Sequence, residues 1–171
     1  SKDPVTGEDK PERPRRAFDM FRNRAIFPII DQYGNVLAFG GRALGDVQPK
    51  YLNTSDTPVF NKRLGVYAAN LLKKERNLKR VILVEGYMDA IALHQYGFDC
   101  AVASLGTSLT EEHATLLSRY TEQVYLIYDA DEAGQRAAQR AIPMLERAGL
   151  RIKVLKIRDA KDPDEFLKKF G

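Results

Sequence analysis

Cysteine and histidine are scarce in this sequence of 171 residues, which holds a single cysteine, Cys100, two histidines and no tryptophan. One cysteine cannot form a disulfide within the chain, and one cysteine with two histidines cannot complete a Cys/His zinc site. We therefore expect no zinc in this chain. Any metal that it binds should be held by oxygen ligands.

Long hydrophobic runs are also absent. No apolar run approaches the roughly 18 residues that mark a membrane-spanning helix, and the N-terminal SKDPVTGEDKPERPRR has no hydrophobic signal core. These absences predict a soluble, cytoplasmic protein with no membrane partner. Because the chain opens with Ser and not Met, we expect it to be a piece of something longer.

What is present is a globular composition with an uneven charge, since 44% of the residues are hydrophobic and 29% are charged. Residues 1–80 carry 16 Lys and Arg against 9 Asp and Glu, and residues 81–171 carry 11 against 14, so the two parts have net charges of +7 and −3. A basic part joined to an acidic part suits a protein that holds phosphates in one place and cations in another. Ordinary solvated surface is the alternative.

The N-terminal half contains a short antiparallel pattern. Residues 1–17 are rich in charge and predict a flexible arm. From Ala25 the sequence gives AIFPII, a DQYGN turn and VLAFGGRAL, which predict two strands of a hairpin, with YLN at 51–53 as a third strand. Residues 66–76 have helical spacing. We therefore predict a small, basic, β-rich α+β subdomain over 18–78.

The remaining residues, 79–171, have a pattern that predicts alternating strands and helices. Apolar runs at 81–84, 101–104, 124–128 and 152–157 alternate with helical patterns at 88–96, 110–119 and 133–148. This alternation predicts a central, mainly parallel four-stranded sheet with helices on both faces, an α/β sandwich. Pro143 lies inside the last helical pattern, where we expect it to kink or split the helix.

Acidic residues follow three of the four apolar runs. The six carboxylates are Glu85, Asp89, Asp129, Asp131, Asp162 and Asp164. The carboxyl ends of parallel strands meet at one edge of a sheet, so we expect these side chains to converge. Like charges about 4 Å apart repel by roughly 4 kcal/mol at an effective dielectric near 20, which makes divalent cations their natural partners.

Each acid also has a purely structural interpretation. Asp89 has a place in the first turn of a helix, where the helix dipole favours a negative charge. Asp162 precedes Pro163 and lies three residues before Glu165, the pattern of a helix N-cap. Glu85 is harder to explain in this way, because it directly follows a buried strand.

Other motifs carry less chemistry. No GxxxxGK[ST] loop occurs, which argues against a Walker-type NTPase. Ser108 to Glu111 has the form of a capping box, with Ser108 as the cap. Cys100 has no nearby histidine in sequence and favours a buried, inert thiol, and His94 and His113 favour packing or surface roles.

These motifs together resemble one known family. VEGYMDAIAL, ASLGTSLT, YDADEAGQRAA and DAKDPDEF resemble, in order and spacing, the TOPRIM domain of bacterial DnaG-type primases. The similarity continues upstream into FRNRAIFPIIDQYGNVLAFGGRAL and PKYLNT, which resemble the subdomain just before TOPRIM in the primase RNA polymerase core. It therefore covers residues 18–171.

The resemblance assigns roles by position. Glu85, Asp129 and Asp131 match the catalytic TOPRIM acids, and Asp89, Asp162 and Asp164 match further acids of primases; together these six would bind two or more Mg²⁺ or Mn²⁺ ions. A nucleotide- and template-binding cleft is implied for the residues Arg22, Arg24, Arg42, Lys50, Tyr51, Asn53, Lys62 and Tyr87.

The implied activity is DNA-directed RNA synthesis, a nucleotidyl transfer of class EC 2.7.7 that makes short RNA primers on single-stranded DNA for replication. The implied partners are the template, NTPs, the RNA primer and, through regions outside this chain, a replicative helicase at the bacterial replication fork. Two alternatives stay open: a TOPRIM topoisomerase or nuclease, and a nucleic-acid- or nucleotide-binding module that is inactive in isolation.

Overall fold

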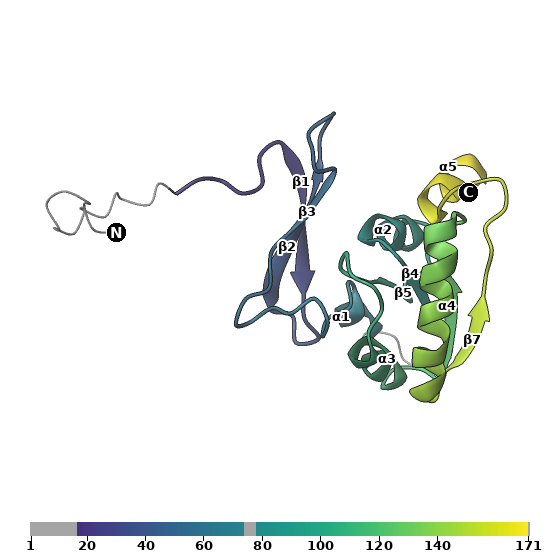
Figure 1. The fold of residues 1–171 in the computed structure, drawn as a ribbon. Helices are drawn as coiled ribbons and strands as arrows, with labels where there is room; N and C mark the ends of the chain where they lie inside the picture. The colour runs from purple at the N-terminus through teal and green to yellow at the C-terminus, as the bar shows by residue number, and fades with distance from the viewer. Residues whose placement is uncertain (1–16, 74–77, 171) are drawn as a thin grey trace, which may run out of the picture.

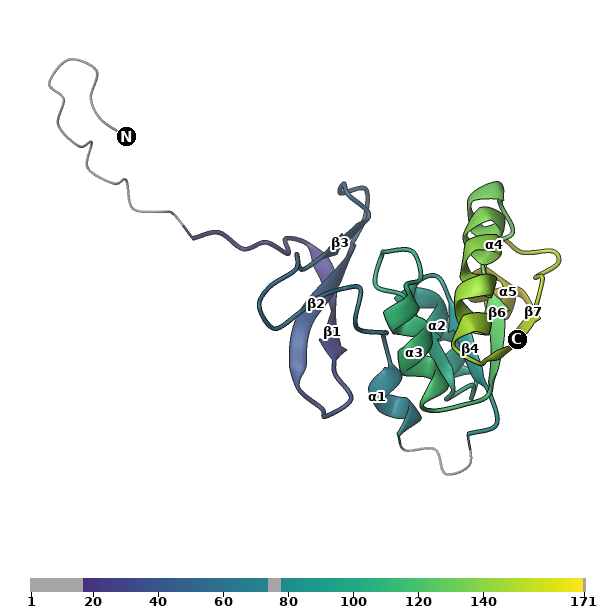
Figure 2. The same ribbon diagram turned by 60° about the horizontal axis from the view of Figure 1, so that its bottom comes forward.

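The computed structural model describes residues 17–73 and 78–170, which form two separate β-sheets with helices around the second (Figure 1). The smaller sheet lies on one side of the molecule. The larger sheet, with its helices, lies on the other side, and both views show this separation (Figure 2). The predicted arm over residues 1–17 falls, except for residue 17, outside the described residues.

The smaller sheet is antiparallel and has the order β1-β2-β3. Its strands are β1 (Arg24–Ile30), β2 (Val36–Ala43) and β3 (Tyr51–Asn53). The turn between β1 and β2 is held by Asp31, whose carboxylate accepts hydrogen bonds from the backbone N–H of Tyr33 and of Asn35. Gly34 supplies the positive φ of 94° that this turn requires. The predicted hairpin and third strand are therefore confirmed.

The larger sheet is parallel throughout and has the order β5-β4-β6-β7. Its strands are β4 (Val81–Val84), β5 (Ala101–Ala103), β6 (Gln123–Ile127) and β7 (Arg151–Val154). Every residue of β4 and of β5 is buried. Continuous aliphatic runs such as VILV are typical of a parallel sheet that is covered on both faces.

Helices cover both faces of the parallel sheet. On one face, α3 (Glu111–Ser118) and α4 (Glu132–Arg147) bury a core that includes Leu117 and Leu145. On the other face, α2 (Tyr87–Gln95) and α5 (Pro163–Phe170) bury Leu93 and Leu167. The predicted α/β sandwich is confirmed. No helix in the described part of the chain is both long and apolar enough to cross a membrane.

A junction of hydrogen bonds joins the two sheets. The Asn53 side-chain N–H donates to the carbonyl of Leu105, just after β5, at 3.4 Å. His113, at the start of α3 and fully buried, is 2.8 Å through Nε2 from the carbonyl of Lys62. Tyr67 exchanges backbone hydrogen bonds with Ala103 of β5. The small sheet is thus anchored along the β5 side of the larger one.

Several predicted details differ in the structure. The helix expected over 66–76 is the single turn α1 (Ala69–Leu72), and residues 74–77 lie outside the described part. The strand expected over 152–157 ends at Val154. Pro143 does not split α4, which continues to Arg147.

The capping box at the start of α3 is shifted by two residues from the predicted one. Thr110, not Ser108, is the N-cap, and its side chain accepts from the backbone N–H of His113. His113 replaces the expected acid, because its Nδ1 accepts from the backbone N–H of Thr110 at 3.2 Å. The buried ring thus satisfies a helix end and a loop carbonyl at once.

Candidate active site

Glu85 lies at the carboxyl end of β4, in the position directly after the buried run. Its Oε1 accepts a hydrogen bond from the backbone N–H of Asp129 at 3.0 Å, and its carbonyl accepts from the Ser104 hydroxyl at 3.0 Å. Burial raises the pKa of Glu85, and the charges of Asp129 and Asp131 raise it further. The ends of three strands, β4, β5 and β6, therefore meet at Glu85: its carboxylate accepts from the loop after β6, and its backbone carbonyl accepts from Ser104 after β5.

The loop from β6 into α4 carries Asp129 and Asp131. Asp131 caps α4, because its Oδ1 accepts from the backbone N–H of Gly134 at 2.8 Å. Gly134 makes the close approach feasible: a Cβ there would overlap the carbonyl oxygen of Asp129 and lie 2.8 Å from Oε1 of Glu85. The start of α4 is thus pressed against both acids.

A second set of acids joins α2 to α5. Asp89, in the first turn of α2, accepts a long hydrogen bond of 3.4 Å from the backbone N–H of Asp164. Asp162 caps α5 by accepting from the backbone N–H of Glu165 at 2.8 Å, as the sequence predicts. Burial and then the charge of Asp162 raise the pKa of Asp89 to about 7.

Asp129 links the two sets into one electrostatic group. Burial raises its pKa, and the charges of Asp162 and Asp131 raise it further, whereas Lys161 lowers it. The structure thus brings all six predicted acids to one edge of the parallel sheet. Among residues 17–73 and 78–170, however, no three His, Cys, Asp or Glu residues lie in an arrangement that could already hold a metal ion. The six predicted ligands at this edge are all carboxylates, which repel one another. Such a set of oxygen ligands suits hard divalent cations.

The inner face of the small sheet lies opposite this acidic edge. Arg42 pairs with Tyr51 across β2 and β3, and Gly40 pairs with Asn53, so these residues share one face. The Tyr87 ring, at the start of α2, packs against Tyr51 with 5.7 Å between ring centroids. The charges of Asp89, Asp162 and Asp164 all raise the pKa of Tyr51, which burial raises most.

The predicted basic residues divide into two groups. Arg42 and Arg24 both act electrostatically on Tyr87, and Lys50 lies over the Tyr51 ring at 5.7 Å, so these three border the junction. The structure does not bring Arg22 and Lys62 into the same group. Arg22 packs on Phe18 and donates to the Asp19 carbonyl, and Lys62 is held through its backbone by Asp56 and His113.

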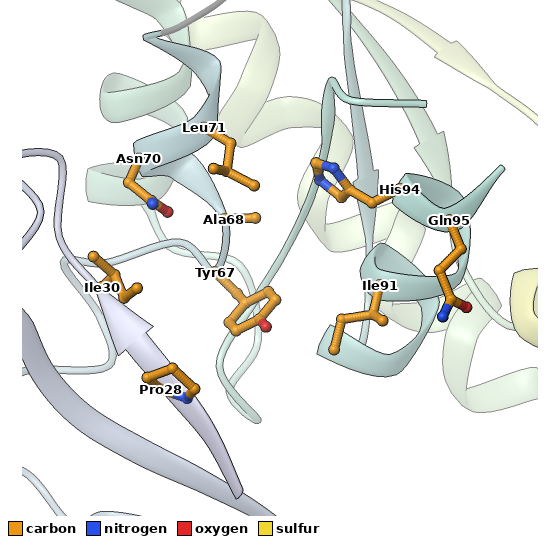
Figure 3. Close-up of a pocket in the computed structure, with 9 residues that line it drawn as sticks. All are labelled: Pro28, Ile30, Tyr67, Ala68, Asn70, Leu71, Ile91, His94 and Gln95. Carbon is orange, nitrogen blue, oxygen red and sulfur yellow. The ribbon is translucent and has the colours of Figure 1, made fainter. Parts of the chain in front are cut away.

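Two cavities adjoin the junction. One, of about 480 Å³, lies beside Glu85 between α4 and the loop after β5; its lining includes Ser104, Thr107, Ser108 and Arg140. The other, of about 420 Å³, lies between β1, the segment 67–71 and α2 (Figure 3). Pro28, Ile91 and the Tyr67 ring make this second cavity largely apolar. Its lining contains no carboxylate.

Sequence reasoning missed four residues that shape the acidic edge. Lys161 offsets the charge of Asp129, and Lys168 pairs with Asp164 through a contact of 2.6 Å. The spacing of Asp164 and Lys168, four residues apart on a helix, is the signal that could have identified that pair. Gly134 and Ser104 act through packing and through a backbone hydrogen bond, and no local sequence signal indicates either role.

Both parts of this chain are similar to known protein families. Residues 82–167 match the Toprim-like family, and residues 7–73 match the N-terminal domain of the DNA primase catalytic core. The DNA primase of Clostridium acetobutylicum is 50% identical over 160 residues, which are 94% of this chain and 27% of that protein.

Two solved structures have the same fold. The Aquifex aeolicus primase, with its zinc-binding and RNA polymerase domains, gives a TM-score of 0.86 at 39% identity and covers 95% of this chain and 41% of its own. A DnaG primase catalytic domain bound to single-stranded DNA gives 0.85 at 42% identity, over 91% of this chain and 52% of its own.

The two family matches show that the chain consists of a Toprim-like domain preceded by the N-terminal domain of a primase catalytic core. This chain belongs to the bacterial DnaG-type DNA primase family. It spans about a quarter of the length of the curated relatives it matches and about half of the solved catalytic cores.

Proposed function

We propose that this chain carries the nucleotidyl-transfer centre of a primase, which joins NTPs into a short RNA primer on a single-stranded DNA template. The observation that carries the proposal is the acidic edge of the parallel sheet facing Arg42 and Tyr51 of the small sheet. The names of the relatives and the DNA-bound structural neighbour support it. The reaction belongs to class EC 2.7.7.

The six acids would form two metal sites. Glu85, Asp129 and Asp131 would hold one Mg²⁺ or Mn²⁺ ion, and Asp89, Asp162 and Asp164, with Asp129 between the sets, would hold another. When bound, such ions supply neutralisation of phosphate charge and a lower pKa for an attacking hydroxyl. Lys161 and Lys168 partly balance the acids when the ions are absent.

The remaining residues bind and orient the substrates. Arg42, Arg24 and Lys50 border the junction and would donate to the triphosphate, because charge-assisted hydrogen bonds to phosphate are strong. Tyr51, 43% exposed, offers a ring on which a base can stack. Arg22 and Lys62, which the structure does not group with these residues, would contact the template backbone, so binding should weaken with salt.

The proposal also fixes an organisation and a setting. Residues 18–78 would form the basic substrate-binding subdomain and residues 79–171 the TOPRIM domain. The protein would work in the bacterial cytoplasm at the replication fork, within a primosome. It would meet the replicative helicase through regions outside this chain.

Primer synthesis by matched acid variants tests the proposal. Glu85→Gln keeps the oxygen that accepts from Asp129, and Asp129→Asn keeps the side-chain size, so both variants should fold. We expect each to lose about 100-fold or more of the RNA synthesis that the chain supports on single-stranded DNA with Mg²⁺ or Mn²⁺. Glu132→Gln is the control, because Glu132 follows Asp131 but is 90% exposed and pairs only with Arg136 among the described residues.

The outcomes separate the competing functions. RNA synthesis lost in both acid variants and kept in Glu132→Gln supports the primase centre. Metal-dependent cleavage of DNA without RNA synthesis would indicate a topoisomerase or nuclease. If none of the three substitutions changes nucleic-acid binding and the unmodified chain makes no RNA, the chain is a nucleic-acid-binding module.

A further inference from the structure

Lys168, in the last turn of α5, forms an ion pair at the acidic edge. Its Nζ lies 2.6 Å from Oδ2 of Asp164, one helical turn earlier. This hydrogen bond raises the pKa of Lys168 most, whereas the charge of Arg42 lowers it and the charge of Asp162 raises it. The ammonium group is therefore within electrostatic range of two acids of the edge and of an arginine of the small sheet, although 65% of the side chain is exposed.

Asp164 is held between this ion pair and the start of α2. Its backbone N–H donates to Oδ1 of Asp89 at 3.4 Å, and only 24% of its side chain is exposed. Asp164 thus belongs with Asp89 and Asp162 in the second set of acids. Of its two carboxylate oxygens, Oδ2 already accepts from Lys168. A metal ion at this set must therefore share Asp164 with an ammonium group or displace that group.

The next residue of α5 makes a similar pair with an acid outside the edge. Nζ of Lys169 lies 2.9 Å from Glu165, again four residues earlier, and donates to the carbonyl of Asp159. The other carboxylate oxygen of Glu165 accepts from the backbone N–H of Lys161. The helix α5 thus carries two ion pairs of the same spacing, and only the pair of Lys168 uses one of the six acids.

A divalent cation and the ammonium group of Lys168 compete for Asp164. An ion pair between exposed residues four apart stabilises a helix only slightly, so the pair is easily broken. A divalent ion binds carboxylate oxygens at about 2.0–2.6 Å and carries twice the charge of an ammonium group. Two such cations on one carboxylate repel each other. Binding of a metal ion to Asp164 therefore displaces Lys168.

We propose that Lys168 is a positioning residue that holds the carboxylate of Asp164 until a divalent cation displaces its ammonium group. Through this exchange Lys168 balances the second set of acids before the ion binds, and it lowers the affinity of that set for the ion. The exchange rests on the proposed function, because it assumes a divalent cation at these acids.

Calorimetric titration of Mn²⁺ into the chain tests the exchange. Lys168→Gln removes the competing ammonium group, so we expect it to bind Mn²⁺ about 3- to 10-fold more tightly than the unmodified chain does. Lys169→Gln is the matched control, because it removes the same charge one residue later from a pair with Glu165. Salt screening should limit the effect of the control to less than about twofold at 0.15 M salt.

Two further backgrounds locate the effect. In Asp164→Asn, adding Lys168→Gln should leave the remaining Mn²⁺ binding unchanged, because the exchange acts only through the carboxylate of Asp164. In Glu85→Gln, which alters the first set of acids, adding Lys168→Gln should still tighten Mn²⁺ binding. A gain in affinity that persists in Asp164→Asn would show that Lys168 acts by another route, and it overturns the exchange.

The remaining outcomes separate the exchange from the proposed function. Equal affinities in Lys168→Gln and Lys169→Gln mean that only net charge matters, and a lower melting temperature without a gain in affinity means that the pair only stabilises α5. Either result overturns the exchange. If Mn²⁺ binding and RNA synthesis are nevertheless lost in Asp129→Asn, the proposed function stands without it. If the unmodified chain binds no Mn²⁺, both fail.

Discussion

The two sheets of this protein differ in how deeply they are buried and in the side chains that they present. In the parallel sheet, β4 and β5 are buried throughout and their carboxyl ends carry acids. In the antiparallel sheet, Ile26 and Phe39 on the outer face are each 43% exposed, and the inner face presents Arg42 and Tyr51. The parallel sheet therefore supplies most of the stability, and the antiparallel sheet supplies a surface held against it. Changes to the two should have very different effects.

The largest effect should come from the core of the parallel sheet. Leu126 in β6 has no exposed surface, so Leu126→Ala should lower the free energy of unfolding by about 3–5 kcal/mol. Phe39→Ala, on the outer face of the small sheet, should cost about 1 kcal/mol or less. Urea denaturation followed by circular dichroism measures both. Similar losses would show that the two sheets share the stability equally.

The next effect concerns the point where α4 meets the acids. Gly134→Ala places a methyl group against the carbonyl of Asp129 and near Glu85, and should cost about 2–3 kcal/mol because the helix start must shift. The same variant should impair metal-dependent synthesis. Ala133→Gly, one residue earlier and exposed, is a matched control that leaves the close approach intact. Wild-type stability in Gly134→Ala would mean that α4 starts elsewhere.

A pH-dependent effect should appear at the contact between the small sheet and α3. Burial lowers the pKa of His113, so the unfolded chain binds this proton more readily than the folded one. The stability it contributes is complete above the unfolded pKa of about 6.5 and declines as the pH falls below that value. Between pH 7.5 and 5.5 we expect a loss of about 1 kcal/mol.

Comparing His113→Gln with the unmodified protein isolates this contribution from the carboxylates, whose raised pKa values act in the opposite direction. Urea midpoints at pH 7.5, 6.5 and 5.5 give the two slopes. Equal slopes for the two proteins would mean that the folded protein protonates His113 as readily as the unfolded chain does.

The smallest effect should be a gain. Ala68 has a φ of 64° at the start of α1, a left-handed conformation that costs a non-glycine residue roughly 1–2 kcal/mol. Ala68→Gly removes that strain but frees the unfolded chain, so the net stabilisation should be about 0.5 kcal/mol. Ala69→Gly, inside α1, should instead destabilise by about 1 kcal/mol. A thermal melt of both variants measures the difference.

Much of the parallel sheet could be predicted from the sequence, and less of the antiparallel one. The run VILV predicted β4 to the residue, because four buried aliphatic residues bounded by polar ones have few other solutions. The position of the acids followed from the rule that parallel strands share one carboxyl edge. IKVLKI was predicted too long because Leu155 and Lys156, although apolar and polar in strand-like alternation, lie beyond the last paired residue.

Long-range contacts explain what could not be predicted. Thr110 is the cap of α3 in place of Ser108 because His113 contacts both the helix end and the carbonyl of Lys62, which is 51 residues away. Likewise, Arg22 and Arg42 look alike in sequence, and only the pairing of β2 with β3 places Arg42 beside Tyr87. Knowing from the sequence that a residue lies in a strand does not determine whether its side chain faces the neighbouring sheet.

The strand order β5-β4-β6-β7 has a geometric consequence for the site. From β4 the chain crosses through α2 on one face to reach β5, and from β6 it crosses through α4 on the opposite face to reach β7. The two adjacent central strands therefore send their helices in opposite directions, and the sheet edge between them is left open. Such a topological switch point is where open α/β sheets bind ligands. Glu85 and Asp129 follow those two strands, so the threading of the chain by itself places both acids at the switch point.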